Sequence, residues 1–341
     1  LCTDNLSDPS IADPTAHFSA TTWTGDGSSS RAITTGVDAD FVWYKDRTGT
    51  ESNSLYDSIR GAQERLISNS TAMEITRSNG LQSFDSTGFT VGSDDECNNS
   101  SKNYVGFTWK AGGTASSNTD GDITSSVSAN TDAGFSIISY AGNSSTATVG
   151  HGLSQGPEII FVKSRSNTHS WSTGTTPIGW TERLEGLNNT NAAATNDAWD
   201  DTAPSSSVIY LTSDGSSNET GNDYICYAFH SVEGYSKVGS YTGNGSLDGA
   251  FFYTGFRPAW ILFKSTASAQ SWRMVDSERS PYNTTDAYLK ASGSDAESSG
   301  MNTDFVSNGV KLRTTSGGVN NSETYIYLAF AESPLKYSRG R

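Results

Sequence analysis

One pattern occurs three times along this chain, and the repetition limits its fold more than any other feature of the sequence. Each copy begins with a short β-rich stretch and a glycine-containing turn: WTGDG, YAGNS and YTGNG. An apolar run follows and ends in a lysine, as in ADFVWYK, PEIIFVK and PAWILFK. The three lysines are Lys45, Lys163 and Lys264.

The end of each copy repeats as well. The runs GFTVGS, VIYLTS and GVKLRT are each followed by a polar loop and then by NYVGFTW, DYICYAF or TYIYLAF. The separation is 15 residues in every copy: Phe89 to Tyr104, Ile209 to Tyr224 and Val310 to Tyr325. Matches in the same order and at the same spacing indicate a tandem duplication with a period of roughly 100 residues, the size of a domain.

The residue types predict strands. Short runs of Val, Ile, Thr, Tyr, Phe and Trp are bounded by Gly, Asn, Asp and Ser clusters, with little 3.6-residue periodicity. The best helical candidate is residues 54–68, which Gly61 interrupts. We therefore predict an all-β chain of three tandem antiparallel β-sandwich repeats of jelly-roll-like type. Nearly continuous apolar strands such as DFVWYK suit either a strand covered on both faces or a core shared with a neighbouring unit.

The repeats divide the chain into segments. A stretch rich in Ser, Thr, Gly and Asn separates the first two copies and is typical of a linker or long exposed loop. No such spacer separates the second copy from the third. The predicted segments are an extended N-terminal strap (1–14), repeat 1 (15–113), a linker (114–133), repeat 2 (134–234), repeat 3 (235–335) and a basic C-terminal tail (336–341).

The charge balance excludes several partners. The chain has 22 Lys and Arg against 37 Asp and Glu, a formal net charge of -15. Nucleic acid is not predicted as a partner, because phosphate binding needs a basic surface that releases counterions.

No apolar run approaches the roughly 20 residues of a membrane span. Of the three cysteines, Cys226 is expected to be a small buried side chain, and a bridge between Cys2 and Cys97 stays open.

The repeats show no catalytic constellation. The histidines lie in no GxSxG or comparable elbow; they are His17, His151, His169 and His230. Acidic residues are so numerous that some pair will lie close together by chance, so a carboxylate pair alone does not indicate a glycosidase. We predict no enzymatic activity and no cofactor. Calcium is the one metal considered, at oxygen-rich loops that contain Asp94, Asp95, Glu96, Asp120 and Asp122.

One polar pattern is repeated in two of the three copies. An aspartate and an arginine follow the strand lysine by 12 and 15 residues, whereas Thr175 and Ile178 replace them in the second copy. Aspartate and arginine three residues apart commonly form a local ion pair. A structural clasp is the favoured interpretation, and a binding role is the alternative. The candidate clasp or contact positions are Lys45, Asp57, Arg60, Lys163, Lys264, Asp276 and Arg279.

Three tryptophans lie in the loop-rich middle of the second copy. Trp171, Trp180 and Trp199 are candidates for stacking on sugar rings. The same side chains could equally fill a core or an interface. Both interpretations stay open on the sequence alone.

Several longer motifs are distinctive in combination: YTGNG, GFRPAWILFK, DSER, NGVKLRT, TYIYLAFAESP, FDSTGFTVGS and NYVGFTWKAGGT. With them the chain resembles a family of tandem-repeat β domains in predicted virion structural proteins, tail-fibre-like in type, from marine bacteriophages and cyanophages. The resemblance spans nearly the whole chain and implies a virion surface role as fibre, spike or decoration. The family offers no established catalytic residues, so none is carried over, and the second copy lacks the DSxR element.

These observations predict a bacteriophage virion structural protein that acts as a self-assembling surface scaffold on the extracellular virion surface. The expected partners are other copies of the chain and other virion proteins, with host-surface glycan as a further candidate. Phage appendages are often trimeric, and three units in one chain could imitate a trimer within one polypeptide. The alternatives are an extracellular carbohydrate-binding or carbohydrate-cleaving module and a subunit of a bacterial surface layer or filament.

Overall fold

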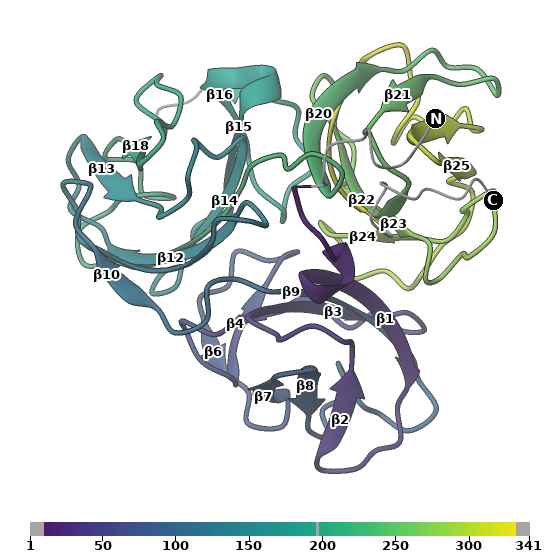
Figure 1. The fold of residues 1–341 in the computed structure, drawn as a ribbon, viewed down its shortest axis with the longest axis horizontal. Coiled ribbons are helices and arrows are strands. Elements are labelled where there is room, and N and C mark those ends of the chain that lie inside the picture. Colours follow the sequence, from purple (N-terminus) through teal and green to yellow (C-terminus); the bar gives the residue numbers. More distant parts are fainter. Residues whose placement is uncertain (1–9, 196–197, 332–341) are drawn as a thin grey trace.

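Strands make up nearly all the regular structure of the chain. The computed structural model describes residues 10–195 and 198–331. Within these ranges there is no α-helix, and the helical turns are two short 3₁₀ segments, η2 (Pro14–Ala16) and η3 (Thr176–Ile178). The predicted fold class is confirmed: the chain is all-β and forms three tandem antiparallel β-sandwiches (Figure 1).

Unit 1 packs a six-stranded sheet against a three-stranded sheet. Its strands are β1 (Phe18–Thr24), β2 (Arg31–Thr34), β3 (Phe41–Asp46), β4 (Ser54–Asp57), β5 (Glu64–Ile67), β6 (Ile75–Thr76), β7 (Leu81–Asp85), β8 (Gly88–Val91) and β9 (Asn103–Trp109). The large sheet has the order β1-β9-β3-β4-β5-β6, and the small sheet has the order β2-β8-β7.

The large sheet of unit 2 has more strands than the large sheets of the other two units. Its strands are β10 (Ser116–Asn118), β11 (Ser125–Asn130), β12 (Phe135–Ala141), β13 (Ala147–Gly150), β14 (Ile159–Ser164), β15 (Ser172–Thr175), β16 (Gly179–Leu184), β17 (Ala194–Thr195), β18 (Val208–Leu211) and β19 (Asp223–Phe229). The large sheet has the order β10-β11-β12-β19-β14-β15-β16-β17, and β13 pairs with β18 in the small sheet.

Unit 3 closes the chain. Its strands are β20 (Ser236–Thr242), β21 (Phe251–Tyr253), β22 (Pro258–Ser265), β23 (Arg273–Asp276), β24 (Tyr288–Lys290), β25 (Thr303–Val306), β26 (Gly309–Leu312) and β27 (Thr324–Ala331). The large sheet has the order β20-β27-β22-β23-β24, and the small sheet has the order β21-β26-β25. In every unit the last strand therefore lies between the strand that leads into the turn signature (β1, β12 or β20) and the lysine-ended strand.

The predicted linker, residues 114–133, is structured, and this corrects the sequence interpretation. Its strands β10 and β11 extend the large sheet of unit 2, and Ile123 bridges to Val149 in the small sheet. The Ser and Thr content suggested a loop, but polar side chains are also tolerated at the end of a sheet, where β10 is the edge strand and β11 is next to it. Ile123 and Val127 supply the buried apolar contacts.

The helical candidate at residues 54–68 is also wrong. This segment forms β4 and β5, joined by a turn in which Gly61 has a φ of 100°. Leu55 and Leu66 pair across the two strands and enter the core. Of the predicted terminal segments, residues 1–9 of the strap and the whole tail (336–341) lie outside the described residues.

Each turn signature is held by one buried asparagine. Its side-chain oxygen accepts a hydrogen bond from the backbone of the fourth turn residue, at 3.1 Å for Asn98, 2.8 Å for Asn218 and 3.0 Å for Asn320. The first glycine of the turn lies against a backbone carbonyl, where a Cβ would come within 2.1 Å at Gly25 and 2.3 Å at Gly142. Close approach of the backbone therefore requires glycine there.

The described residues form four hydrophobic cores. Each sandwich has its own core between its two sheets, and a fourth core lies where the three large sheets face one another (Figure 1). Alternate residues of one strand serve the two cores: in β9, Tyr104 belongs to the core of unit 1, whereas Phe107 and Trp109 belong to the central core. This alternation explains the nearly continuous apolar strands, because both faces of the strand are covered.

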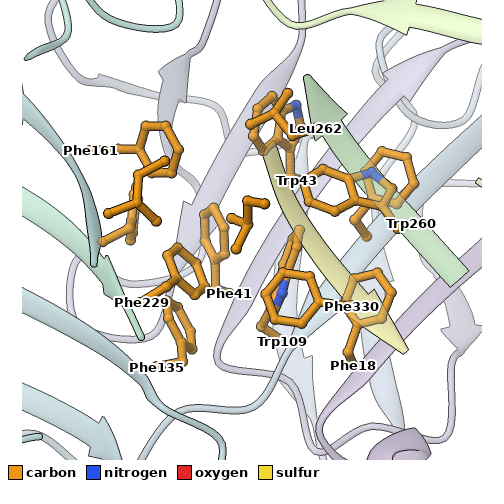
Figure 2. Close-up of a cluster of buried hydrophobic side chains, with 14 of the residues drawn as sticks. Phe18, Phe41, Trp43, Trp109, Phe135, Phe161, Phe229, Trp260, Leu262 and Phe330 are labelled. Atoms are coloured by element: carbon orange, nitrogen blue, oxygen red, sulfur yellow. The ribbon is translucent and has the colours of Figure 1, made fainter. Parts of the chain in front are cut away.

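Aromatic rings from all three units fill the central core (Figure 2). Trp109 of unit 1 lies 5.6 Å from Trp260 of unit 3 and 6.5 Å from Phe229 of unit 2, measured between ring centroids. Phe41 stacks on Tyr227 of unit 2 at 4.3 Å. The remaining void has a volume of about 10 Å³, the least space that holds one water molecule. The centre is therefore a packed core that joins the units and leaves no room for a ligand.

Candidate functional site

The three repeated lysines lie at the junctions between units. Each is buried, and its ammonium group donates to backbone carbonyls. Lys163 of unit 2 reaches the Thr71 carbonyl of unit 1 at 3.2 Å, and Lys264 of unit 3 reaches the Thr190 carbonyl of unit 2 at 3.3 Å. Lys45 bonds to carbonyls of its own unit, including that of Gly49 at 3.1 Å. Hydrogen bonding to carbonyls is what makes a buried ammonium tolerable.

At all three junctions, the side chain of the residue eight positions after the lysine donates a hydrogen bond to a carbonyl of the neighbouring unit. Trp171 Nε1 donates to the Ile67 carbonyl of unit 1 at 2.9 Å, and Trp272 Nε1 donates to the Gly186 carbonyl of unit 2 at 2.9 Å. In unit 1 this position is Asn53, whose Nδ2 donates at 2.9 Å to the carbonyl of Gly293 in unit 3. The contacts run from each unit to the previous one and close on themselves.

A backbone hydrogen bond marks the same cyclic order. The carbonyl acceptor in each case is the residue two positions after the lysine. The N–H donors and carbonyl acceptors are Glu74 to Arg165 at 2.9 Å, Ala193 to Thr266 at 2.8 Å and Glu297 to Arg47 at 2.8 Å. Three equivalent junctions in cyclic order give the chain an internal pseudo-threefold arrangement.

The junction between units 1 and 2 contains a buried ionic cluster. Asp57 and Arg60 form the predicted pair, and both side chains are fully buried. Arg60 also contacts Glu74 at 3.1 Å, and Glu74 in turn binds Arg165 of unit 2 at 2.8 Å. The hydroxyl of Tyr227, from unit 2, donates to Asp57 at 2.7 Å. Burial acts to lower the pKa of Arg60, but the neighbouring carboxylates raise it above its ordinary value, so the guanidinium stays charged.

The junction between units 3 and 1 repeats this cluster. Asp276 binds Arg279 at 2.6 Å, and Arg279 contacts Glu297 at 3.1 Å. Glu297 also binds Arg47 of unit 1 at 2.8 Å. Burial acts to raise the pKa of Glu297, but hydrogen bonding to Arg47 and the charge of Arg279 bring it below its ordinary value. The position of Tyr227 is taken by Phe107, so this copy has no phenol.

The junction between units 2 and 3 has no ionic cluster of this kind in the described residues. All the charged positions have changed together, because a lone buried charge would be unpaired. The residues at the five equivalent positions are Thr175, Ile178, Ala193, Thr266 and Leu328. The absence of the DSxR element from the second copy is thus part of a change at a whole junction.

The repeat spacing pointed to some of these residues and missed others. Arg47 and Arg165 both follow their lysine by two positions, so the repeat pattern contained a signal for them. Glu74 and Glu297 follow the lysine at different distances, in loops of unequal length, and no sequence signal singles them out.

The buried lysines make stability depend on pH. Burial lowers the pKa of Lys45, Lys163 and Lys264 to about 8. An unfolded lysine has a pKa of about 10.4, so between these values each of these lysines binds more protons in the unfolded chain than in the folded chain. The contribution of the lysines to the free energy of unfolding therefore rises with pH in that window, and the cost of burying the ammonium groups is fully present below about pH 8.

We expect the free energy of unfolding of the parent chain, minus that of the variant Lys163→Met, to increase from about pH 8 to about pH 9.5 in urea unfolding. The difference isolates this lysine from the buried Cys97 and Cys226, whose raised pKa acts on stability with the opposite sign over the same range. Its slope should be up to about 1.4 kcal/mol per pH unit. A difference that is constant over this range would show that Lys163 titrates normally.

The tryptophans considered for sugar stacking are all buried, and this corrects that interpretation. Trp171 lies in the central core and bonds across a junction, while Trp180 and Trp199 pack edge to face at 6.1 Å in the core of unit 2. A buried ring has no face available to a sugar. These side chains have the second role considered from the sequence, filling a core or an interface.

A polar depression of about 270 Å³ in unit 2 contains the nearest approach to a catalytic grouping. Asp214 there accepts hydrogen bonds from Ser216 and contacts Arg183 at 3.2 Å. Burial acts to raise the pKa of Asp214, but the hydrogen bonds from Ser216 and the charge of Arg183 bring it below its ordinary value. His169 Nε2 lies 3.0 Å from Glu219. The Asp214 carboxylate is held in its charged form beside Arg183, and a charged carboxylate has no proton to donate as a general acid.

The loops considered for calcium use their oxygens within the protein. Asp122 accepts a hydrogen bond from the backbone of Thr148 at 3.0 Å, and Glu96 is buried against Arg65. In the part of the chain that the structure describes, no three His, Cys, Asp or Glu side chains are grouped so that they could hold a metal ion. Cys97 and Cys226 are buried free thiols, and Cys2 lies outside the described residues. Residues 10–195 and 198–331 contain no helix that could span a membrane.

The fold and its junctions define a class of protein: an all-β scaffold in which three sandwiches of one chain close around a shared aromatic core. A family model for a domain of unknown function, DUF7483, matches residues 13–334, and the chain belongs to this family. The match extends across all three units, in agreement with their shared core. No curated protein and no solved structure matches the chain.

Proposed function

We propose that the chain is a structural component of a bacteriophage virion surface, of the fibre, spike or decoration type. The observation that carries the proposal is the central core, in which rings from three sandwiches pack around a common centre. A chain with this arrangement forms a stiff body without any partner, and it presents three similar sets of loops outward. The sequence resemblance to virion proteins supplies the setting.

The junction chemistry supports a mechanical role. The carboxylates at the two ionic junctions are paired with arginines, and the third junction has no such ionic cluster in the described residues. These paired charges are mostly buried. Their effect is to fix the units relative to one another, which suits a scaffold that must keep its shape on a particle.

The carbohydrate-binding alternative has lost its predicted platform, because Trp171, Trp180 and Trp199 are buried. Among the described residues, the aromatic side chains that are exposed by half or more are in unit 3: Phe251, Tyr253 and Tyr282. These rings are candidates for stacking on host glycan, and a glycan array with purified protein tests them.

The proposed function is tested on particles of the phage that encodes the chain. An antibody raised against the purified protein is used for immunogold labelling in negative stain, and mass spectrometry of gradient-purified particles counts the copies. We expect labelling at one defined structure and a fixed number of copies per particle. Absence of the protein from intact particles would contradict the proposal.

A further inference from the structure

The outer edge of the small sheet in unit 3 carries two exposed aromatic side chains. Phe251 and Tyr253 of β21 have 50% and 64% of their surface exposed, while Phe252 between them is buried in the core of the unit. β21 pairs with β26 on one side. Exposed apolar side chains on an edge strand favour pairing with another strand.

The fold does not require these aromatics. The strands β2, β13 and β21 are equivalent, because Ile33, Val149 and Phe252 pair with Phe89, Ile209 and Val310 at the same repeat position. The inward residue is apolar and buried in all three units. The residues that flank it are Ala32 and Thr34 in unit 1, Thr148 and Gly150 in unit 2, and Phe251 and Tyr253 in unit 3.

In unit 2 the equivalent edge, that of β13, pairs with another segment of the chain. The chain at residues 121–123 runs beside β13, and Ile123 forms a parallel bridge to Val149. Ile123 N–H donates to the Thr148 carbonyl at 2.9 Å, and Thr148 N–H donates to Asp122 at 3.0 Å. The equivalent edge in unit 3 is that of Phe251, and no described residue makes these two bonds to its backbone.

The other equivalent edges are closed or charged. In unit 1, Arg31 of β2 carries a charge beside Asp26 at 3.7 Å, and charge protects an edge from pairing. On the far side of the small sheet of unit 3, the side chain of Asn283 binds both the N–H and the carbonyl of Phe305 in β25, at 2.9 and 3.0 Å. In β21, by contrast, the side chains are apolar and no described residue bonds to the outer backbone groups of Phe251. The Tyr253 carbonyl accepts a hydrogen bond from the Tyr327 hydroxyl at 3.2 Å and keeps a second lone pair for another donor.

The local charges favour a second copy of the same chain as the occupant. The whole chain carries a net charge of -15, so copies repel one another in general. Around β21 the charges cancel, because Lys311 binds Asp248 at 2.7 Å and Arg313 binds Asp304 at 2.7 Å. Two copies can therefore approach at this edge without the repulsion that acts elsewhere.

We propose that two copies of the chain associate by antiparallel pairing of their β21 strands. A twofold axis at Phe252 places Phe251 of one copy opposite Tyr253 of the other, and the two three-stranded sheets become one sheet of six strands. Aromatic cross-strand pairs stabilise such an edge, and the backbone of Phe251 gains the partners that Thr148 has in unit 2. The inference rests on the proposed scaffold function, since it names the surface through which copies assemble.

Sedimentation velocity over a wide concentration range tests the pairing. We expect the parent chain to form dimers as its concentration rises. The double variant Phe251→Ala with Tyr253→Thr, which copies unit 1, should raise the dimer dissociation constant by about tenfold or more. The control Tyr282→Ser removes an aromatic that is 84% exposed in the same unit but outside β21, and it should leave the dimer unchanged. An unchanged thermal midpoint shows that each variant folds.

Hydrogen exchange locates the contact. In the dimer, amides of residues 250–254 should become protected relative to the dilute protein, while the double variant shows no change with concentration. A parent chain that stays monomeric, or dimers that persist in the double variant, would overturn the inference while leaving the virion labelling test intact. Loss of glycan binding in the double variant of a parent chain that is itself monomeric would assign the patch to sugar and also overturn the inference.

Discussion

Trp109→Ala should lower the free energy of unfolding by about 3–5 kcal/mol. The Trp109 side chain is 1% exposed and its ring packs against Phe18 and Phe41 of unit 1, Phe229 of unit 2 and Trp260 and Phe330 of unit 3. Removing the ring leaves a cavity that borders all three units. Urea unfolding followed by tryptophan fluorescence and circular dichroism measures the loss.

The region that is destabilised distinguishes the central core from the core of a single unit. Trp199 is equally buried, but it lies in the core of unit 2. Trp109→Ala should increase hydrogen exchange in the central strands β9, β19 and β27 together, whereas Trp199→Ala should increase it in unit 2. Trp109→Phe should cost less than Trp109→Ala, because ring contacts remain and the indole N–H has no hydrogen-bond partner in the described residues. An effect of Trp109→Ala confined to unit 1 would contradict a shared core.

Arg60→Ala should lower the free energy of unfolding by about 3–5 kcal/mol, although it removes no aromatic ring. Asp57 then loses its cationic partner at a junction where its side chain is fully buried, and Glu74 keeps only Arg165. An unpaired buried carboxylate is costly, and part of the penalty should disappear at acidic pH as the carboxylates become protonated. Urea unfolding at neutral and mildly acidic pH measures both effects.

A matched variant copies the junction between units 2 and 3, which has no such ionic cluster in the described residues. It should unfold within about 1 kcal/mol of the parent or be more stable, because a buried ionic cluster can be replaced by packed neutral side chains without loss. The substitutions are Asp57→Thr, Arg60→Ile, Glu74→Ala, Arg165→Thr and Tyr227→Leu. If this variant is as unstable as Arg60→Ala, the cluster contributes stability that neutral packing cannot replace, and the junctions are not equivalent.

The repeated spacings were enough to predict the strands and the sandwich type. Lysine-ended runs and closing hairpins recur at fixed separations, so the pairing of the last strand with the lysine-ended strand has the same register in every unit. The pair of Asp57 and Arg60 was also accessible, because residues three apart on a tight turn lie close together.

Contacts between units could not be predicted from local sequence patterns. The burial of Trp171 depends on the carbonyl of Ile67, a residue 104 positions earlier in the chain. Glu74 and Glu297 lie in loops of different length, so their equivalence appears only in three dimensions. The strands at residues 114–133 were missed because Ser and Thr are typical both of loops and of outer strands.

Differential scanning calorimetry of the whole chain tests the shared core most directly. With one central core joining three sandwiches, the chain should unfold in a single transition whose calorimetric and van't Hoff enthalpies agree. Resolution of the endotherm into three transitions, one for each sandwich, would mean that the units are stable alone and that the central core does not unite them.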